Sequence, residues 1–551
     1  MIQTYDDLVP VTEDQANWTL PKSLRDQSLA RGDSTFLIMP DEGRQWTYAE
    51  MLRDSETVAG HFVAAGAQPG DRIIIMGENS SQFIRAWFAS SLSSTVEVPL
   101  NTSYEGEFLS HQVQTVDARF AVIDDTFAAR FVAIGEVARK IESFWVIDTG
   151  HGADAIALLR SAGFTAMPWE ELEEETGMDV ELREPEPADL AAILFTSGTT
   201  GPSKGVAMPH GQVYFFATEI ASLTRLGPQD TYMSVTPLFH ANAQFLAVLP
   251  ALITGGRVVV RRRFSASRWI DQVREHQVTA TNFIGVMMSF VAKQKKRPDD
   301  RDNSLRVIFA APTAATLTDE FIDRFGLEAI VEAFGLTETS NPFLTPYGAR
   351  RPAGAVGLLV ADWFDARLVD PETDREVALG EVGELVVRPK YPWTASLGYY
   401  NLPQKTVEAW RNLWFHTGDA LWQDSSGWYY FVDRYKDALR HRGHNISSYE
   451  IEQAILGLDG IVDCAVIGVP SEFEGGEDDV LAIVVTNSEI EASQIWAWCE
   501  GKVPDYATPR YVRFADALPK TPTEKIQKTT LRSEGITAET IDRLKISQRP
   551  L

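Results

Sequence analysis

Short apolar runs alternate with longer amphipathic stretches in the first two thirds of the chain. Runs rich in Ile, Val and Leu predict buried strands at 71–76, 95–100 and 190–195, and the stretch 81–91 predicts a helix between the first two strands. Strands that alternate with helices form sheets covered by helices. The pattern therefore predicts an α/β fold in this part of the chain.

The same alternation continues in a second unit. A helix is expected from Gln212, followed by strands at 231–237 and 255–260. At 551 residues, of which 44% are hydrophobic, the chain is too long for one hydrophobic core and has enough apolar residues for several. We therefore expect a large multi-subdomain N-terminal lobe that contains two α/β sheet subdomains.

Beyond about residue 360 the chain becomes rich in strand-forming residues. Strands are expected at 364–369, 383–388 and 428–432, with little helical periodicity between them. This pattern predicts a small β-barrel-like subdomain at the end of the N-terminal lobe.

After residue 432 the pattern is that of a compact α+β domain. Ser447 and Glu450 have the spacing of a capping box, and apolar positions follow from Ile451, so a helix is expected to start there. A domain of roughly 115 residues is of ordinary size. We therefore divide the chain into an N-terminal domain at 1–432, a hinge linker at 433–438 and a C-terminal domain at 439–551.

Charge and cysteine content narrow the class of protein. The 50 Lys and Arg residues are outnumbered by 77 Asp and Glu residues, a net charge of −27, which argues against nucleic acid and anionic membranes as partners. The sequence has neither a signal-peptide pattern nor an apolar stretch of spanning length, so we expect no integral membrane segment. The two cysteines, Cys464 and Cys499, favour a reduced, cytoplasmic compartment. The expected assembly is a homodimer, the commonest kind.

A glycine- and hydroxyl-rich loop follows the strand predicted at 190–195. It reads Thr-Ser-Gly-Thr-Thr-Gly-Pro-Ser-Lys-Gly over residues 196–205. Glycines let backbone N–H groups turn toward an anion, hydroxyls add donors, and the lysine adds a positive charge, whereas the alternative is an ordinary turn. The spacing differs from Gly-x-x-x-x-Gly-Lys-Ser/Thr, so the loop is not of the Walker type. The expected phosphate contacts are Thr196, Ser197, Gly198, Thr199, Thr200, Gly201 and Lys204.

Two further motifs follow in the N-terminal lobe. Pro237-Leu-Phe-His-Ala-Asn242 contains a histidine beside apolar residues, which by itself is typical of a structural histidine. Glu332-Ala-Phe-Gly-Leu-Thr-Glu338 contains a ring that can stack on adenine, a glycine that can admit a nucleotide, and a carboxylate that can hold Mg²⁺.

Two more motifs lie toward the C-terminus. Trp414-Phe-His-Thr-Gly-Asp419 ends in a carboxylate, which can accept hydrogen bonds from both hydroxyls of a ribose, and Arg434 supplies a guanidinium after it. Pro519-Lys-Thr-Pro-Thr-Glu-Lys525 ends in a lysine that would, in isolation, be interpreted as a solvated loop residue.

In this order the five motifs resemble those of the adenylate-forming (AMP-binding) superfamily, in its acyl-CoA synthetase or acid–CoA ligase branch. The resemblance covers nearly the whole chain and implies a small mobile C-terminal lobe. It implies ATP, Mg²⁺ and CoA as cofactors and a small-molecule carboxylic acid as substrate. In the implied reaction, ATP converts the acid to an acyl adenylate with release of pyrophosphate, and CoA then displaces AMP.

The resemblance also implies a role for each residue that matches a motif. Lys525 bridges the carboxylate and the α-phosphate, Thr337 contacts the α-phosphate, Glu338 and Thr200 hold Mg²⁺, and His240 gates the acyl site. The other nucleotide and CoA contacts are Ala310, Ala311, Pro312, Glu332, Ala333, Phe334, Gly335, Asp419, Phe431, Arg434, Lys436, Gly443 and His444. The acyl-pocket candidates are His240, Asn242, Phe283, Gly285, Ala310 and Thr339.

Within the five motifs the chain departs from the family pattern at two positions. Phe334 stands where Tyr is commoner, which keeps the ring but loses the hydroxyl. Glu524 replaces the usual glycine before Lys525. Lys436 aligns with the hinge about which the family's small lobe rotates, and this rotation would bring Gly443 to the channel for CoA.

Three alternatives remain open on the sequence. A freestanding adenylation enzyme would load a carrier protein instead of CoA, and a luciferase-type oxidase is a more distant relative. A catalytically inactive nucleotide-binding regulator is supported only by Glu524 and would form no AMP. The acid itself is not identified by any motif. Small or medium acids are expected. Ser448 stands where many relatives have Pro, and in this feature the chain resembles ligases for carnitine-like and other short polar acids.

Overall fold

The computed structural model describes most of the chain, and the three largest gaps fall at 175–180, 197–202 and 471–478. The described residues are 3–174, 181–196, 203–311, 313, 315–434, 439–441, 444–446, 448–470, 479–500, 502–503, 507–520 and 526–546.

The N-terminal sheet has seven strands, and parallel pairing dominates it. Its order is β7 (Thr165–Pro168), β6 (Ser143–Ile147), β5 (Phe120–Asp124), β3 (Arg72–Met76), β4 (Val96–Pro99), β8 (Leu190–Thr196) and β9 (Lys204–Pro209). Only β9 runs antiparallel, because it returns directly from β8. Ile73 and Ile75 face one core and Ile74 and Met76 the other, so β3 is apolar on both faces.

The central sheet repeats this arrangement with the expected second unit. Its order is β14 (Ala329–Val331), β13 (Val307–Ala310), β12 (Ala280–Phe283), β10 (Thr231–Ser234), β11 (Arg257–Val260), β1 (Thr35–Met39) and β2 (Arg44–Thr47). Its first six strands pair in parallel, and β2 closes the edge antiparallel to β1.

Helices form three layers around these two sheets. One layer belongs to the core shared by both sheets and contains α1 (Leu20–Arg31), α2 (Tyr48–Ala64), α3 (Ser81–Leu92), α7 (His210–Thr224) and α9 (Leu249–Thr254). The outer layer of the N-terminal sheet contains α4 (Gly106–Val116), α5 (Ala128–Ala133) and α6 (Gly152–Ser161). That of the central sheet contains α10 (Trp269–Glu275), α11 (Gly285–Ala292) and α12 (Thr318–Phe325).

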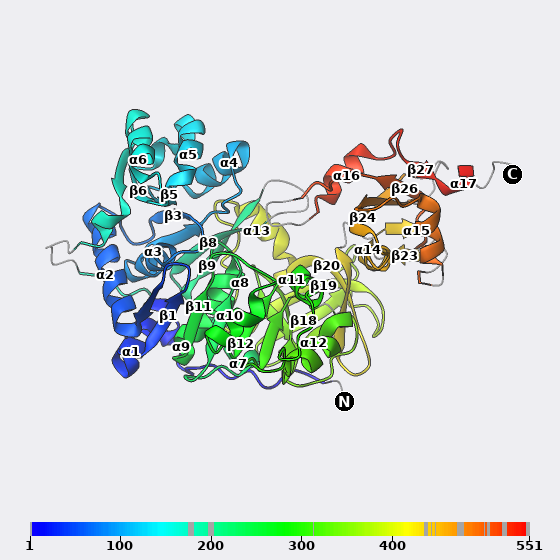
Figure 1. Cartoon of the computed structure of the whole chain (residues 1–551), viewed down its shortest axis with the longest axis horizontal. Coiled ribbons are helices and arrows are strands. Elements are labelled where there is room, and N and C mark those ends of the chain that lie inside the picture. The colour runs from blue at the N-terminus through cyan, green and yellow to red at the C-terminus, as the bar shows by residue number, and fades with distance from the viewer. Residues whose placement is uncertain are drawn as a thin grey trace.

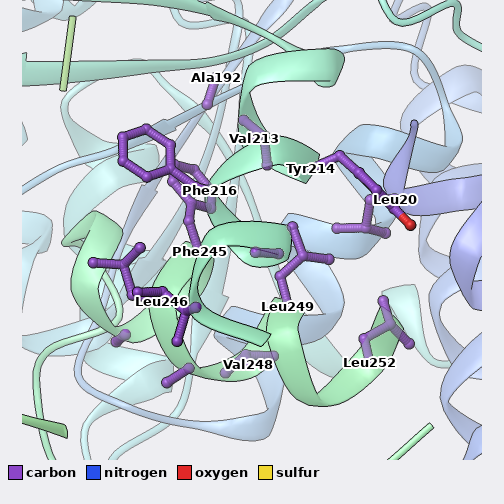
Figure 2. Packing of buried hydrophobic residues seen from close by; sticks show 14 of the residues in the cluster. Leu20, Ala192, Val213, Tyr214, Phe216, Phe245, Leu246, Val248, Leu249 and Leu252 are labelled. Atoms are coloured by element: carbon purple, nitrogen blue, oxygen red, sulfur yellow. The ribbon is translucent and has the colours of Figure 1, made fainter. Parts of the chain in front are cut away.

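Helix α7 lies in the middle of the shared core and is buried along almost its whole length. Val213, Tyr214 and Phe216 pack near Phe245 and Leu249 of the π-helical segment η5 (Gln244–Val248) and α9, as Figure 2 shows. A helix that is apolar on every side is a core element, so its few polar side chains must find partners inside the protein.

The predicted barrel-like subdomain is a seven-stranded antiparallel sheet. Its order is β15 (Ala333–Leu336), β16 (Ser340–Leu344), β17 (Ala355–Leu359), β21 (Trp428–Arg434), β20 (Phe415–Gln423), β19 (Gly383–Pro389) and β18 (Phe364–Val369). Helix α13 (Pro403–Ala409) lies between β19 and β20 in the chain. This subdomain completes the large N-terminal lobe that the sequence predicts.

The C-terminal residues form a separate body beside the large lobe (Figure 1). Its sheet has the order β24 (Ile461–Val469), β25 (Asp479–Thr486), β26 (Tyr511–Phe514) and β27 (Ile541–Asp542). The hairpin β22 (Leu439–His441) and β23 (His444–Ile446) precedes it, and its helices are α14 (Ser448–Leu456), α15 (Ala492–Cys499), α16 (Lys528–Glu534) and α17 (Arg543–Ile546). The fold is therefore the predicted α/β architecture with a small α+β lobe. The exact division at 433–438 remains a prediction, since 435–438 lie outside the described residues.

Within the part of the chain that the structure describes, every helix is too short or too polar to cross a bilayer. Both cysteines are free and buried.

Candidate active site

The predicted phosphate loop begins and ends on adjacent strands of the N-terminal sheet. Thr196 ends β8 and Lys204 begins β9, and the two are paired across the ladder. Thr196 Oγ1 donates to the Lys204 carbonyl at 3.5 Å. The predicted contacts Ser197, Gly198, Thr199, Thr200 and Gly201 lie outside the described residues.

A second chain segment pairs with the other edge of β9. Leu397 N donates to the Ala207 carbonyl at 2.8 Å, and Tyr400 N donates to the Gly205 carbonyl at 2.8 Å. The strand that leaves the phosphate loop is therefore hydrogen-bonded on both sides, by β8 and by the segment 397–400. This segment precedes α13 and belongs to the antiparallel subdomain.

The Thr-Glu motif lies in the turn between β15 and β16 and is held from α7. Gln212 Nε2 donates to the Thr337 carbonyl at 2.9 Å. Glu219, two helical turns further along α7, accepts from Asn341 N at 3.1 Å and from Asn341 Nδ2 at 2.7 Å. Residues seven apart lie on one face of a helix, so a single face of α7 anchors both ends of the segment from Thr337 to Asn341.

Burial favours the neutral form of the Glu219 carboxyl. The Glu219 side chain is fully buried, and burial raises the pKa of its carboxyl well above the usual range, although the hydrogen bonds from Asn341 oppose this shift. A neutral carboxyl avoids the cost of an unpaired buried charge. We found no sequence signal for this anchor.

Glu338 lies at the centre of the site, with 7% of its surface exposed. Its backbone carbonyl accepts from Ser396 N at 2.9 Å. Its Oε1 accepts from the Tyr399 hydroxyl at 3.0 Å. The face of the Tyr399 ring lies 4.0 Å from Lys204 Nζ. The sequence motifs did not indicate Tyr399, which touches residues of two of them.

Glu332 is paired with an arginine that the sequence analysis did not single out. Its Oε2 lies 2.7 Å from Arg351 Nη1 and accepts from Thr313 N at 3.1 Å. Burial raises the pKa of the Glu332 carboxyl, and the guanidinium of Arg351 opposes that shift. Glu332, which was predicted to contact the nucleotide, is therefore ion-paired with Arg351 just before β15 begins.

Two of the predicted adenine and ribose contacts come together. The ring centroids of Phe334 and Phe431 are 6.0 Å apart, and the Phe334 ring also contacts Phe343 at 6.1 Å. Gly335 is required by the hairpin itself, because a Cβ there would overlap the Ser340 carbonyl oxygen and lie 2.7 Å from Asn341 Cα. This close approach was not part of the sequence prediction, which attributed the glycine to the nucleotide.

Asp419 lies on β20 opposite Arg434 on β21. Its side chain is almost wholly buried, and its N–H donates to Thr417 Oγ1 at 3.0 Å. Phe431 lies three residues before Arg434 on the same strand. The predicted ribose and base contacts Asp419, Phe431 and Arg434 are thus placed on two neighbouring strands.

The acyl-pocket candidates divide into two groups. His240 and Asn242 are partly exposed at the start of α8 (Ala241–Ala243), and Asn242 Oδ1 accepts from Thr236 Oγ1 at 3.0 Å and from Asn282 Nδ2. Phe283 is fully buried, with its ring centroid 5.2 Å from that of Trp269.

The remaining acyl-pocket candidates are Ala310, Gly285 and Thr339, and two predicted nucleotide contacts, Ala311 and Ala333, lie at the end of β13 and at the start of β15. Ala310 and Phe283 lie in the same core cluster, and Ala311 follows at the end of β13. Gly285 begins α11. Thr339 is buried beside Glu338, and Ala333 is buried at the start of β15.

The predicted C-terminal site residues fall largely in the gaps of the described chain. Lys525, Lys436 and Gly443 lie outside the described residues, as does Pro312 of the large lobe, and His444 begins β23. The base of the loop that carries Lys525 is described: Lys520 and Ile526 form an antiparallel bridge, and Gln527 N donates to the Pro519 carbonyl at 2.8 Å. The described residues on the two sides of the gap at 521–525 are therefore hydrogen-bonded to each other.

The donor set suits a metal that arrives with a nucleotide. Within the described residues no group of three or more His, Cys, Asp or Glu side chains could hold a metal ion by itself. Mg²⁺ is usually bound through one or two carboxylates together with substrate phosphates, and Glu338 offers one carboxylate beside the phosphate-loop strand. The residues present therefore fit Mg²⁺ bound with ATP.

Comparison with known proteins agrees with this geometry. The family model described as AMP-binding enzyme matches residues 24–400, and that of the AMP-binding enzyme C-terminal domain matches residues 450–525. A feruloyl-CoA synthase of Amycolatopsis sp. is 30% identical over 499 residues, which is 89% of this chain and 94% of that protein. A crotonobetaine/carnitine–CoA ligase of Proteus mirabilis is 29% identical over 496 residues, covering 89% and 93%.

A solved structure is similar over almost the whole chain. ATP-bound MatB from Rhodopseudomonas palustris superposes with a TM-score of 0.78 at 26% identity, covering 94% of this chain and 99% of that one. The chain thus belongs to the AMP-binding enzyme family, as the five motifs predicted.

Within that family it is an AMP-forming acid–CoA ligase, an acyl-CoA synthetase that uses ATP and CoA. The predicted branch and reaction are therefore confirmed. The roles of the individual site residues remain predictions.

Proposed function

We propose that the enzyme activates a small or medium-sized carboxylic acid at the site around Glu338, with the residue roles expected from the motifs. The observation that carries this proposal is that Lys204, at the end of the phosphate loop, and Glu338, in the Thr-Glu motif, contact the same tyrosine ring. Two motifs 134 positions apart in numbering thus meet at one point, as a shared phosphate and metal site requires.

In the first half-reaction the substrate carboxylate attacks the α-phosphorus of ATP and pyrophosphate leaves. Thr337 and Lys525 would contact the α-phosphate, where negative charge develops, and Lys204 and the loop N–H groups would contact the outer phosphates. When bound, Mg²⁺ neutralises phosphate charge, and Glu338 together with Thr200 would hold it. Asp419 and Arg434 would orient the ribose, and Phe334 and Phe431 would pack beside the base.

In the second half-reaction the CoA thiol attacks the acyl carbon and AMP leaves. Lys525 must withdraw before the thiol can approach the same carbon. We propose that the C-terminal domain turns about the linker 433–438, with Lys436 at the hinge, and that Gly443 and His444 then line the approach of CoA. This proposal is supported by Lys520 and Ile526, which flank residues 521–525 in the chain and are bridged to each other within the small C-terminal body.

The acid is proposed to lie beside His240 and Asn242. Support comes from their partial exposure next to a polar cluster, in which Thr236 and Asn282 donate to Asn242 Oδ1. The two similar curated proteins are, by name, ligases for ferulate and for crotonobetaine or carnitine. An aromatic acid and a betaine-type acid are therefore the first substrates to compare.

The test is AMP release with Mg·ATP and a panel of ferulate, crotonobetaine, carnitine and short aliphatic acids, with and without CoA, with mass detection of acyl-CoA. Acid-dependent AMP with an acyl-CoA product would support the proposal and identify the acid. Pyrophosphate exchange without acyl-CoA would instead favour a carrier protein as acceptor. No AMP with any acid would contradict the assigned roles.

We also propose that the enzyme works in the cytoplasm as a homodimer. The two free, buried cysteines support a reducing compartment. Analytical ultracentrifugation tests the assembly, and a single species at the 61.3 kDa mass of one chain would contradict the dimer.

A further inference from the structure

Tyr399 is a buried tyrosine whose hydroxyl and ring contact residues of two different motifs. Its hydroxyl donates to Glu338 Oε1 at 3.0 Å, and the face of its ring lies 4.0 Å from Lys204 Nζ. Only 8% of its surface is exposed. The side chain therefore connects the end of the phosphate loop to the carboxylate assigned to Mg²⁺, and neither the motifs nor the reaction as described gives it a role.

The backbone around Tyr399 fixes where its ring can lie. Tyr399 pairs with Val206 of β9 in an antiparallel bridge, and its N–H donates to Thr406 Oγ1 of α13 at 2.9 Å. Neighbouring bonds from Ala207 N to the Gly398 carbonyl, at 2.9 Å, and from Tyr400 N to the Gly205 carbonyl extend the pairing. The backbone segment that carries the Tyr399 ring is thus paired with β9, the strand that also carries Lys204.

The two contacts strengthen each other. A phenol that donates to a carboxylate has a more electron-rich ring, and such a ring attracts an ammonium group more strongly. The hydrogen bond to Oε1 also restrains the orientation of the Glu338 carboxylate, whose oxygens would hold the metal. One side chain therefore sets both the orientation of Glu338 and the position of Lys204.

We propose that Tyr399 is a positioning residue for adenylation, which orients Glu338 toward Mg²⁺ and holds Lys204 beside the phosphates. This inference rests on the proposed function, because it takes Glu338 as the metal ligand. Tyr399 acts through these two side chains and touches neither the acid nor CoA in this role.

Two substitutions separate the two contacts. Tyr399→Phe removes the hydroxyl and keeps the ring, so the Mg²⁺ concentration for half-maximal adenylation should rise about tenfold, as expected for a lost hydrogen bond to a charged group. Tyr399→Leu also removes the ring face, so it should raise the Kd of ATP, measured by calorimetry without acid, further than Tyr399→Phe does. Tyr400→Phe makes the same chemical change one residue further on and should leave both values within about twofold.

The decisive readouts are Mg²⁺-dependent ATP binding by calorimetry and thioester formation from a supplied acyl adenylate, which needs neither Mg²⁺ nor pyrophosphate release. Tyr399→Phe should weaken the first and spare the second. Loss of both to the same extent would indicate a merely structural tyrosine and overturn the proposal.

Glu338→Gln separates this inference from the proposed function. If Glu338→Gln changes the Mg²⁺ dependence and Tyr399→Phe does not, the positioning role is wrong and the metal assignment stands. If Glu338→Gln leaves the Mg²⁺ dependence unchanged, the metal assignment itself is wrong.

Discussion

Asp419 and Arg434 are directly opposed on the antiparallel strands β20 and β21. The pairing fixes a carboxylate and a guanidinium-bearing residue at one point of the antiparallel sheet, three residues from Phe431. Vicinal hydroxyls are well matched by one carboxylate that accepts from both.

Replacing Asp419 by Asn should therefore weaken ATP binding about 10- to 100-fold, because one acceptor becomes a donor and the charge is lost. Calorimetric titration with ATP measures this change. Asp365→Asn, on β18 of the same sheet, removes an equal charge from the pair with Arg388 and serves as the control. Equal affinities of the parent and Asp419→Asn would show that the ribose lies elsewhere.

Lys525→Ala should abolish adenylation, by at least about 10³-fold, because it removes the positive charge that is proposed to bridge the carboxylate and the α-phosphate. Thioester formation from supplied acyl adenylate should stay within a few-fold of the parent. The two half-reactions are followed separately, as pyrophosphate exchange and as acyl-CoA formation.

Lys520→Ala is the matched control for this experiment, since Lys520 lies at the base of the same loop and pairs with Asp463 at 2.7 Å. A comparable loss of both half-reactions in Lys525→Ala would contradict the proposal that Lys525 acts in adenylation and is withdrawn, with the small domain, before thioester formation.

The buried carboxyl of Asp124 should make the stability of the folded protein depend on pH. Burial raises the pKa of its carboxyl from 3.8 to about 7, although the hydrogen bond from Glu78 N opposes the shift. Between these pH values the folded protein keeps a proton that the unfolded chain has lost, so stability should fall as pH rises from about 4 to 7. The contribution is at most about 4 kcal/mol.

Asp124→Asn should remove this part of the pH dependence, because the amide keeps an acceptor for Glu78 N and does not titrate. The midpoint of thermal unfolding, measured from pH 4 to pH 8 for both proteins, checks the difference between them. Parallel pH profiles would mean that the Asp124 pKa is not raised in the folded protein.

Gly335→Ala should destabilise the large lobe by about 1–3 kcal/mol or more, because the added Cβ would overlap the Ser340 carbonyl oxygen and the backbone would have to move. Thr337 and Glu338 follow in the same hairpin, so adenylation should fall as well. Thermal unfolding and pyrophosphate exchange measure the two effects.

Gly227→Ala offers the comparison, since the nearest atom to its Cβ would be Asp230 Oδ2 at an ordinary 3.8 Å. Similar small effects of the two substitutions would show that the β15–β16 hairpin tolerates a side chain.

Much of the architecture could be predicted because apolar runs between turn residues carry a direct signal. The run at 190–195 is β8, and the stretch at 81–91 is α3, whose N-cap Ser80 accepts from Phe83 N at 3.2 Å. The motif residues were found because their spacing is local. Distant partners such as Arg351 and Tyr399 were missed, because nothing in a local pattern says which distant carboxylate a side chain will meet.

Glu219 illustrates the same limit. It lies in a helix that is buried along almost its whole length, and its partner Asn341 is 122 positions away. A single acidic residue in an apolar stretch interrupts the periodicity and would be interpreted as a solvent-facing position. Only the tertiary structure shows that it holds the Thr-Glu turn.

The seven-residue spacing of Gln212 and Glu219 on α7 fixes the relative position of the two side chains that anchor the Thr-Glu turn. Inserting or deleting one residue between them would rotate one anchor by about 100° relative to the other, so both could no longer reach the same turn. The length of this interval should therefore be invariant wherever the Thr-Glu turn is kept, while loops near His240, where the acid is proposed to bind, can change with the acid. Redesign of substrate choice should accordingly leave the register of α7 untouched.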